Sequence, residues 1–302
     1  MTRTAWSRYF LAMALLTSVA FIIWFAGANA RAQQTASGDW TATVSEDKSE
    51  IHLNFNRRDG SGRNQMGHHY EFSDLQGLSR EQALSGGRVS FSLVREAGRV
   101  DLEGSFQDGK GSGTFRFTAN QQFVAAMKLR GFDFEEKQNR DHDWENRLFA
   151  ATVLNVTTSL ADDLTSAGFG KLKTDDLFKA AIFKIDSTFM REMKASGFEN
   201  LGMEELVKAR IFKIDPAFVS QVSQMGFAKE PFETLVKMQI FKVTPAFVAE
   251  IRNEGLTDIA IEGLVKLRIF KIDSEFIRAA RAEGVPLEVE RLVQRKIGVA
   301  RR

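Results

Sequence analysis

The sequence predicts an α+β protein of two modules, in which a small antiparallel β meander or barrel-like domain precedes an α-solenoid of short helix-turn-helix repeats. Two patterns lead to this prediction. The C-terminal half repeats one pattern every 29 residues, as in 183–212, 212–241 and 241–270. Residues 39–117 instead alternate apolar and polar side chains, as strands with one buried face do. A fixed period of about 20 to 50 residues is typical of stacked repeats.

Residues 1–32 have the pattern of a targeting segment. Arg3 and Arg8 precede an apolar run of about 20 residues, and small-residue cleavage patterns follow it. Because the run is just long enough to cross a bilayer, two outcomes stay open: removal as a signal peptide, or retention as an N-terminal membrane anchor. Either outcome predicts export.

Residues 33–38 are interpreted as a polar linker, and residues 39–117 as the β domain. Turn sequences separate six alternating segments, which are expected to form one antiparallel sheet. Residues 73–83 break the alternation and are expected to form a loop with a helical turn. A domain of this size supports one modest core, and we expect it to lean on the first helical repeat.

Residues 118–302 are predicted to be the helical repeat domain, and each repeat reads as two short helices. In the repeat at 212–241, Asp215 is placed to cap the first helix, Pro216 follows it, and Gly226 stands where a left-handed residue ends that helix. In the preceding repeat, the second helix is expected to place Leu206, Val207 and Ile211 on one apolar face. About six units are expected, with irregular first and last members.

Composition narrows the class of protein further. The chain has no cysteine, so disulfides are excluded and packing must provide its stability outside the cytoplasm. Its formal net charge of +2 is too small for a general polyanion binder, and nucleic acid is therefore not an expected partner.

Residues for catalysis or metal binding are not found in any recognisable arrangement. The four histidines lie outside an HExxH helix, and His68 and His69 would point to opposite faces of a strand. No motif joins a serine to a histidine, and the glycine-rich turns lie between strands, where they do not cradle phosphate. The sequence predicts no catalytic residue, no metal and no cofactor. The histidines are His52, His68, His69 and His142.

Two ladders of identical residues run through the repeats. Phenylalanine recurs at two repeat positions, which is typical of a solenoid core, with a ligand-binding box as the alternative. This phenylalanine ladder consists of Phe183, Phe212, Phe241, Phe270, Phe189, Phe218, Phe247 and Phe276. Lysine also recurs at two positions, and superposed repeats would align each set into a stripe able to meet an acidic partner or anionic headgroups. The alternative is a solvated face inherited by duplication. The candidate interaction stripe consists of Lys179, Lys208, Lys237, Lys266, Lys184, Lys213, Lys242 and Lys271.

The repeat, in phrases such as IDPAFVSQVSQMGF followed by LVKMQIF, resembles the helical repeats attached to BlaR/MecR-type membrane metallopeptidase sensors in some bacteria. The preceding block, with GDWTATVSEDKSEIHLNFNRRDG and GSGTFRFTANQQFVAAM, is similar to the β module that accompanies those repeats. The resemblance covers roughly residues 38–299 and lacks the peptidase part with its zinc motif. It implies a sensing or partner-binding role in the envelope, without proteolysis.

The expected function is therefore that of a non-enzymatic exported protein, located in the periplasm or on the extracytoplasmic face of a bacterial inner membrane. Its helical repeats would hold a protein or peptide, and the N-terminal segment would attach it to the membrane if retained. One alternative is a carrier that encloses a small apolar ligand in the β domain, with the repeats as scaffold. A hydrolase is a third and weaker reading.

Overall fold

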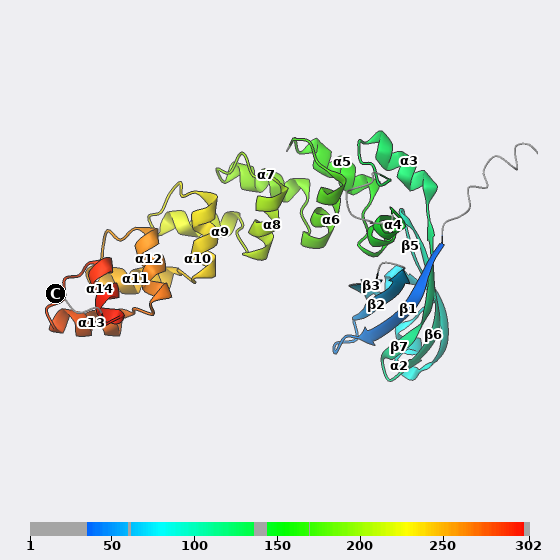
Figure 1. Ribbon diagram of the computed structural model, residues 1–302, viewed down its shortest axis with the longest axis horizontal. Coiled ribbons are helices and arrows are strands. Elements are labelled where there is room, and N and C mark those ends of the chain that lie inside the picture. The colour runs from blue at the N-terminus through cyan, green and yellow to red at the C-terminus, as the bar shows by residue number, and fades with distance from the viewer. Residues whose placement is uncertain (1–34, 60–61, 136–143, 169, 299–302) are drawn as a thin grey trace, which may run out of the picture. The chain divides into compact units, whose positions relative to one another are not determined.

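The computed structural model describes residues 35–59, 62–135, 144–168 and 170–298 (Figure 1). The targeting segment 1–32 and His142 lie outside the described residues. The chain forms two compact units: one holds the sheet and continues through residue 155, and the other holds residues 130–132 and everything from residue 156. A β module followed by paired helices confirms the predicted α+β class.

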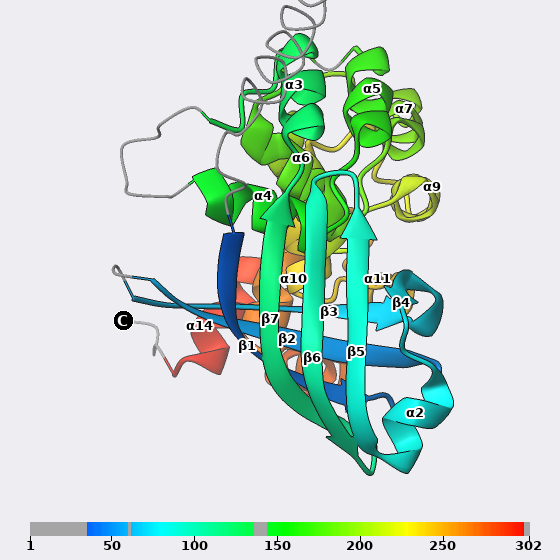
Figure 2. The same ribbon diagram turned by 90° about the vertical axis from the view of Figure 1, so that its right-hand side faces the viewer.

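The first unit is built on one curled antiparallel sheet with strand order β3-β2-β1-β7-β6-β5-β4 (Figure 2). The six predicted strands are present, together with a two-residue strand that the alternation does not predict. Between β3 and β5 lie η1, Phe72–Asp74, and α2, Arg80–Ser85, which supply the expected helical turn. The strands are β1 Thr35–Val44, β2 Glu50–Asp59, β3 Gly62–Glu71, β4 Leu75–Gln76, β5 Gly87–Arg95, β6 Gly98–Gln107 and β7 Lys110–Ala119.

Trp40, on β1, is fully buried against the sheet. Its indole N–H donates to the carbonyls of Glu103 and Thr114, at 3.2 and 3.1 Å, so burial leaves no unpaired donor. Gly104 and Gly113 face each other below it, where a Cβ on either would lie within about 2 Å of backbone oxygen. Glycine is therefore required for the strands to approach each other beneath the indole ring.

Helix α4, Trp144–Val153, covers the inner face of the sheet. Phe149 packs its ring against Phe55, Phe115 and Phe117 at centroid distances of 5.3–5.4 Å. At the end of the helix, the Tyr70 hydroxyl donates to the Val153 carbonyl at 2.9 Å. The predicted contact between the β domain and the first helical repeat is thus made by this helix.

Two predicted boundaries are wrong. The linker assigned to residues 33–38 belongs to β1 from residue 35 onward, because its backbone pairs with residues 115–118 of β7. The segment has small side chains and therefore shows no apolar–polar alternation. Strand pairing is made by backbone hydrogen bonds, which form without that alternation. The boundary at 117/118 is also too early, since α3, Gln121–Leu129, and α4 belong to the compact unit of the sheet.

Helices α3 to α14 form six successive pairs, as the period predicts (Figure 1). The first pair is α3 and α4, and the other five pairs make up the second compact unit. The first helix of each pair is called helix A here and the second helix B. The five pairs are α5 Thr158–Ser166 and α6 Thr174–Phe183, α7 Ser187–Ala195 and α8 Met203–Ile211, α9 Pro216–Gln224 and α10 Phe232–Ile240, α11 Pro245–Asn253 and α12 Ile261–Ile269, and α13 Ser274–Ala282 and α14 Val289–Lys296.

The predicted start and end of helix A are confirmed. In α9 the Asp215 carboxylate accepts from the Phe218 amide at 2.8 Å, and Pro216 occupies the first turn. Gly226 follows the helix with φ of +93°, in the left-handed region where a glycine has no Cβ penalty. The same cap recurs at Asp186, Asp215, Thr244 and Asp273.

Candidate interaction surface

The first lysine set, called here the paired lysine row, forms ion pairs between successive repeats. The Lys208 ammonium lies 2.7 Å from a carboxylate oxygen of Glu233, and Lys237 lies 3.9 Å from Glu262. Each lysine is on one helix B, and its glutamate is on the next. The four pairs are Lys179 with Glu204, Lys208 with Glu233, Lys237 with Glu262, and Lys266 with Glu290.

These ion pairs change how the paired lysine row can act on a partner. The carboxylate of Glu204 raises the pKa of Lys179, and that of Glu233 raises the pKa of Lys208, because each hydrogen bond favours the charged amine. Exposed ion pairs contribute little to folding, because water and salt screen them. Their main consequence is that this row presents no uncompensated positive stripe to a partner.

The second lysine set lies one to two residues beyond the end of each helix B and is called here the αL lysine row. Lys184, Lys213, Lys242 and Lys271 have φ of 52–53°, which is left-handed backbone. The next residue closes the helix end, as the Ile214 amide does by donating to the Ala209 carbonyl at 2.8 Å. All four side chains are exposed, and none forms an ion pair with another described residue.

The backbone of the αL lysine row also joins neighbouring repeats. The Lys184 carbonyl accepts from the Arg210 guanidinium at 2.7 Å, and the Lys242 carbonyl accepts from Arg268 at 3.1 Å. Gln239 makes the corresponding bond to Lys213 at 3.2 Å. These bonds use only the backbone carbonyls of the lysines and make no demand on their side chains.

Lysine is energetically unfavourable at this position, because its backbone is left-handed. A left-handed conformation costs a residue with a Cβ about 1–2 kcal/mol, and a cation beside a helix C-terminus recovers typically about 0.3–1 kcal/mol. The first and last pairs use the cheaper residues at the corresponding place, Asn155 with φ of 56° and Gly298 with φ of 74°. Backbone stability alone therefore does not favour the four lysines.

One isoleucine that the sequence predicts to be buried belongs instead to an exposed row. Ile211 is 53% exposed, so the prediction that it shares a buried face with Leu206 and Val207 is wrong. At about 100° per residue, five positions separate Ile211 from Leu206 by about 140°, and the buried face follows Met203, Leu206 and Ala209 instead. The isoleucine row consists of Ile182, Ile211, Ile240 and Ile269, each 48–53% exposed.

The phenylalanine ladder serves partly as core and partly as a stacking surface. Phe189 and Phe247 are buried, and the Arg210 and Arg268 guanidiniums lie over their rings at 3.7 and 3.8 Å. The phenylalanines at the end of helix B are half-buried, including Phe212. Each arginine lies on helix B of the pair whose helix A carries its ring, so these cation–π contacts join the two helices of one pair.

A surface hollow of about 660 Å³ opens beside α7 and α9. Its lining includes Asp186, Glu192 and Asp215 together with Phe189 and Arg210. Two of these carboxylates are helix caps, and Arg210 already bonds the Lys184 carbonyl. The hollow is therefore lined in part by groups that cap helices or already bond a neighbouring repeat.

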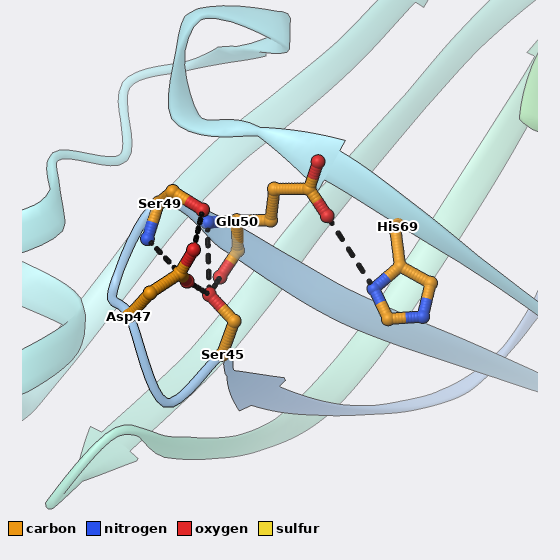
Figure 3. A network of polar contacts seen from close by, with 5 residues as sticks. All are labelled: Ser45, Asp47, Ser49, Glu50 and His69. Atoms are coloured by element: carbon orange, nitrogen blue, oxygen red, sulfur yellow. Dashed lines mark hydrogen bonds and ion pairs between the residues drawn. The ribbon is translucent and has the colours of Figure 1, made fainter.

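The histidines of the β domain lie on both faces of the sheet, as the alternation predicts. His68 is half-buried with its ring 5.2 Å from Tyr70, and burial, followed by the charges of His69 and His52, lowers its pKa. His69 lies on the other face, with Nδ1 3.8 Å from Glu50 (Figure 3). Within the described part of the chain, no three histidine or acidic side chains group to hold a metal ion.

Figure 3 also shows the turn between β1 and β2, where the Asp47 carboxylate accepts from the hydroxyls of Ser45 and Ser49. These bonds, that of Ser45 being the strongest, lower the pKa of Asp47 to about 2. The network closes a tight strand connection through bonds made within the turn itself. These bonds therefore stabilise the turn between β1 and β2.

A comparison with models of known protein families finds no match, and neither does a comparison with curated protein sequences. Among the helices that the structure describes, none combines the length and the apolar character needed to cross a bilayer.

Proposed function

We propose that this chain is an exported, non-enzymatic protein whose helical repeats bind a protein or peptide in the bacterial cell envelope. One observation carries the proposal: four successive repeats expose the same isoleucine and the same lysine, without an ion-pair partner among the described residues, at the end of helix B. Exposed apolar residues that are scattered singly need no explanation, whereas a periodic row with flanking charge is typical of a binding surface.

The proposed cellular role is sensing or signalling outside the cytoplasm. It is supported by the export pattern of residues 1–32 and by the resemblance to the extracytoplasmic part of BlaR/MecR-type sensors. In such a role the β domain would be a folded spacer or a second recognition module. The repeats would provide the recognition surface, because each adds the same contact groups in series.

The alternative of an apolar ligand carrier has less support. The inner face of the sheet carries Trp40, Phe91 and Phe106, and these side chains are at most 3% exposed and pack against one another. Helix α4 adds Phe149 to the same face. A small sheet filled by its own aromatic side chains is typical of a packed core.

Crosslinking and capture from periplasm and membranes tests the proposal. The full chain is compared with a variant in which Lys184, Lys213, Lys242 and Lys271 are asparagine, and with a control in which the paired lysine row is glutamine. Circular dichroism first shows that all three fold. We expect the αL variant to lose a partner that the other two retain. Capture of the same partner by all three chains would contradict the proposed surface.

A further inference from the structure

The chemistry of the partner can be read from the rows at the end of helix B. The isoleucine row lies one helical turn beyond the paired lysine row on the same helix face, as in Lys208 and Ile211, because residues three apart are neighbours. The αL lysine row begins two residues after each isoleucine, and two Cα atoms at that separation are at most about 7.6 Å apart. An apolar row is thus bordered by a positive row.

The spacing of the rows fits an extended chain. Successive B helices contact each other, as α6 with α8 and α10 with α12 do, and packed helices lie about 8–10 Å apart. An extended peptide in the polyproline II conformation has three residues per turn and advances about 3.1 Å per residue, so one turn of about 9 Å spans one repeat and every third side chain points the same way. A side chain at every third position can therefore reach each isoleucine in turn.

We propose that the surface binds an extended acidic polypeptide segment, with an apolar side chain at every third position over the isoleucine row and carboxylates facing the αL lysine row. This inference rests on the proposed function and names the chemistry of the partner. The charge supports it: the paired lysines are neutralised by glutamates, whereas the αL lysines have no counter-ion among the described residues. A carboxylate on the partner would supply this counter-ion.

The glutamates of the ion-pair ladder favour a peptide over an anionic membrane. Glu204, Glu233 and Glu262 have side chains that are 60–68% exposed, and they lie on the same B helices as the isoleucines. A lipid surface wide enough to cover the rows would also cover the ion-pair ladder, which is neutral and so offers no attraction to anionic headgroups. A single extended chain is narrow enough to follow only the apolar and αL rows.

Fluorescence anisotropy with labelled peptides of about twelve residues tests the inference on the full chain. The probe repeats Leu-Asp-Ser in series, a scrambled peptide keeps its composition, and a third replaces every Asp by Lys. We expect saturable binding of the first peptide that weakens with salt, and affinities at least about tenfold lower for the other two. Equal binding of the scrambled peptide would overturn the spacing, and equal binding of the lysine peptide would overturn the charge.

Three variants assign the binding to the rows. Changing the αL lysine row to asparagine, or the isoleucine row to serine, is expected to weaken binding by about tenfold or more. Changing the paired lysine row to glutamine is expected to alter it by less than about threefold. Unaltered binding by the αL variant, with its fold confirmed by circular dichroism, would overturn the inference.

Anionic vesicles and the captured partner distinguish a lipid-binding surface from a peptide-binding one. If vesicles bind in a manner dependent on the αL lysines while the acidic peptide does not, the surface recognises lipid and the peptide inference fails. If the αL variant loses a natural protein partner although the parent chain ignores the acidic peptide, the proposed function stands and the acidic, extended partner is wrong. If the partner is retained and no peptide binds, both fail.

Discussion

In three of the αL lysines, Lys184, Lys213 and Lys242, the backbone carbonyl and the side-chain ammonium have separate roles. The carbonyl of Lys213 accepts a hydrogen bond from Gln239 of the next repeat, and its left-handed backbone ends α8. The ammonium group is exposed and contributes nothing to that bond. Because the two roles are separable, the side chain can be changed while the backbone geometry is kept.

Replacing Lys213 by asparagine is expected to raise the free energy of unfolding by roughly 0.5–1 kcal/mol, because asparagine adopts the left-handed region more readily. Urea denaturation followed by circular dichroism measures the change. The matched control is the same substitution at Lys208, inside α8, which should lower stability by a few tenths of a kcal/mol because asparagine is a poor helix former. A loss of stability at both positions would contradict the cost assigned to the αL lysine.

His68 makes the stability of the β domain depend on pH. Burial lowers its pKa below the ordinary value of 6.5, so the folded state binds fewer protons than the unfolded state in that range. Its contribution is therefore fully present above the unfolded pKa and is lost as pH falls below it. Urea midpoints measured from about pH 7.5 to about pH 5 should decrease, and His68→Gln should reduce that slope. An identical slope in the variant would show that other groups cause it.

At the scale of the elements, helix α4 completes the core of the β domain. Its Phe149 is only 4% exposed and contacts three rings from β2 and β7. The helix thereby closes the open inner face of the curled sheet. This role explains why the first helix pair belongs to the unit of the sheet rather than to the other five pairs.

Phe149→Ala is expected to lower the free energy of unfolding by about 3–5 kcal/mol, as the loss of a buried ring in a core does. Leu129→Ala is the control: this side chain, at the end of α3, is 89% exposed and should change stability by less than about 0.5 kcal/mol. The fluorescence of buried Trp40 during denaturation reports on the β domain. A small effect of Phe149→Ala would mean that the sheet keeps its core without α4.

At the scale of the molecule, local rules predict the regular features well. Asp215, Pro216 and Gly226 each act through their own backbone, so the sequence indicates the ends of helix A correctly. The alternation likewise predicts six strands, because each strand buries one face. The period predicts the six helix pairs because every repeat has the same capping residues and the same apolar positions.

The features that the sequence does not predict depend on neighbours in space. A uniformly positive lysine stripe is the expectation, whereas one row is neutralised by glutamates 24 or 25 residues further along the chain. Ile211 is predicted to be core because apolar residues usually are, and only its angle around the helix separates it from the buried face. Left-handed lysines have no strong sequence signal, since glycine and asparagine are the residues expected there.

The ion pairs between B helices have a direction: the cation belongs to one repeat and the carboxylate to the one that follows. Removing a complete interior repeat brings the lysine before the gap to the glutamate after it, and inserting one supplies a new cation together with a new carboxylate. The array is therefore modular in electrostatic terms. Gene duplication could lengthen or shorten the recognition surface by whole repeats while leaving each lysine of the paired lysine row opposite a glutamate of the next repeat.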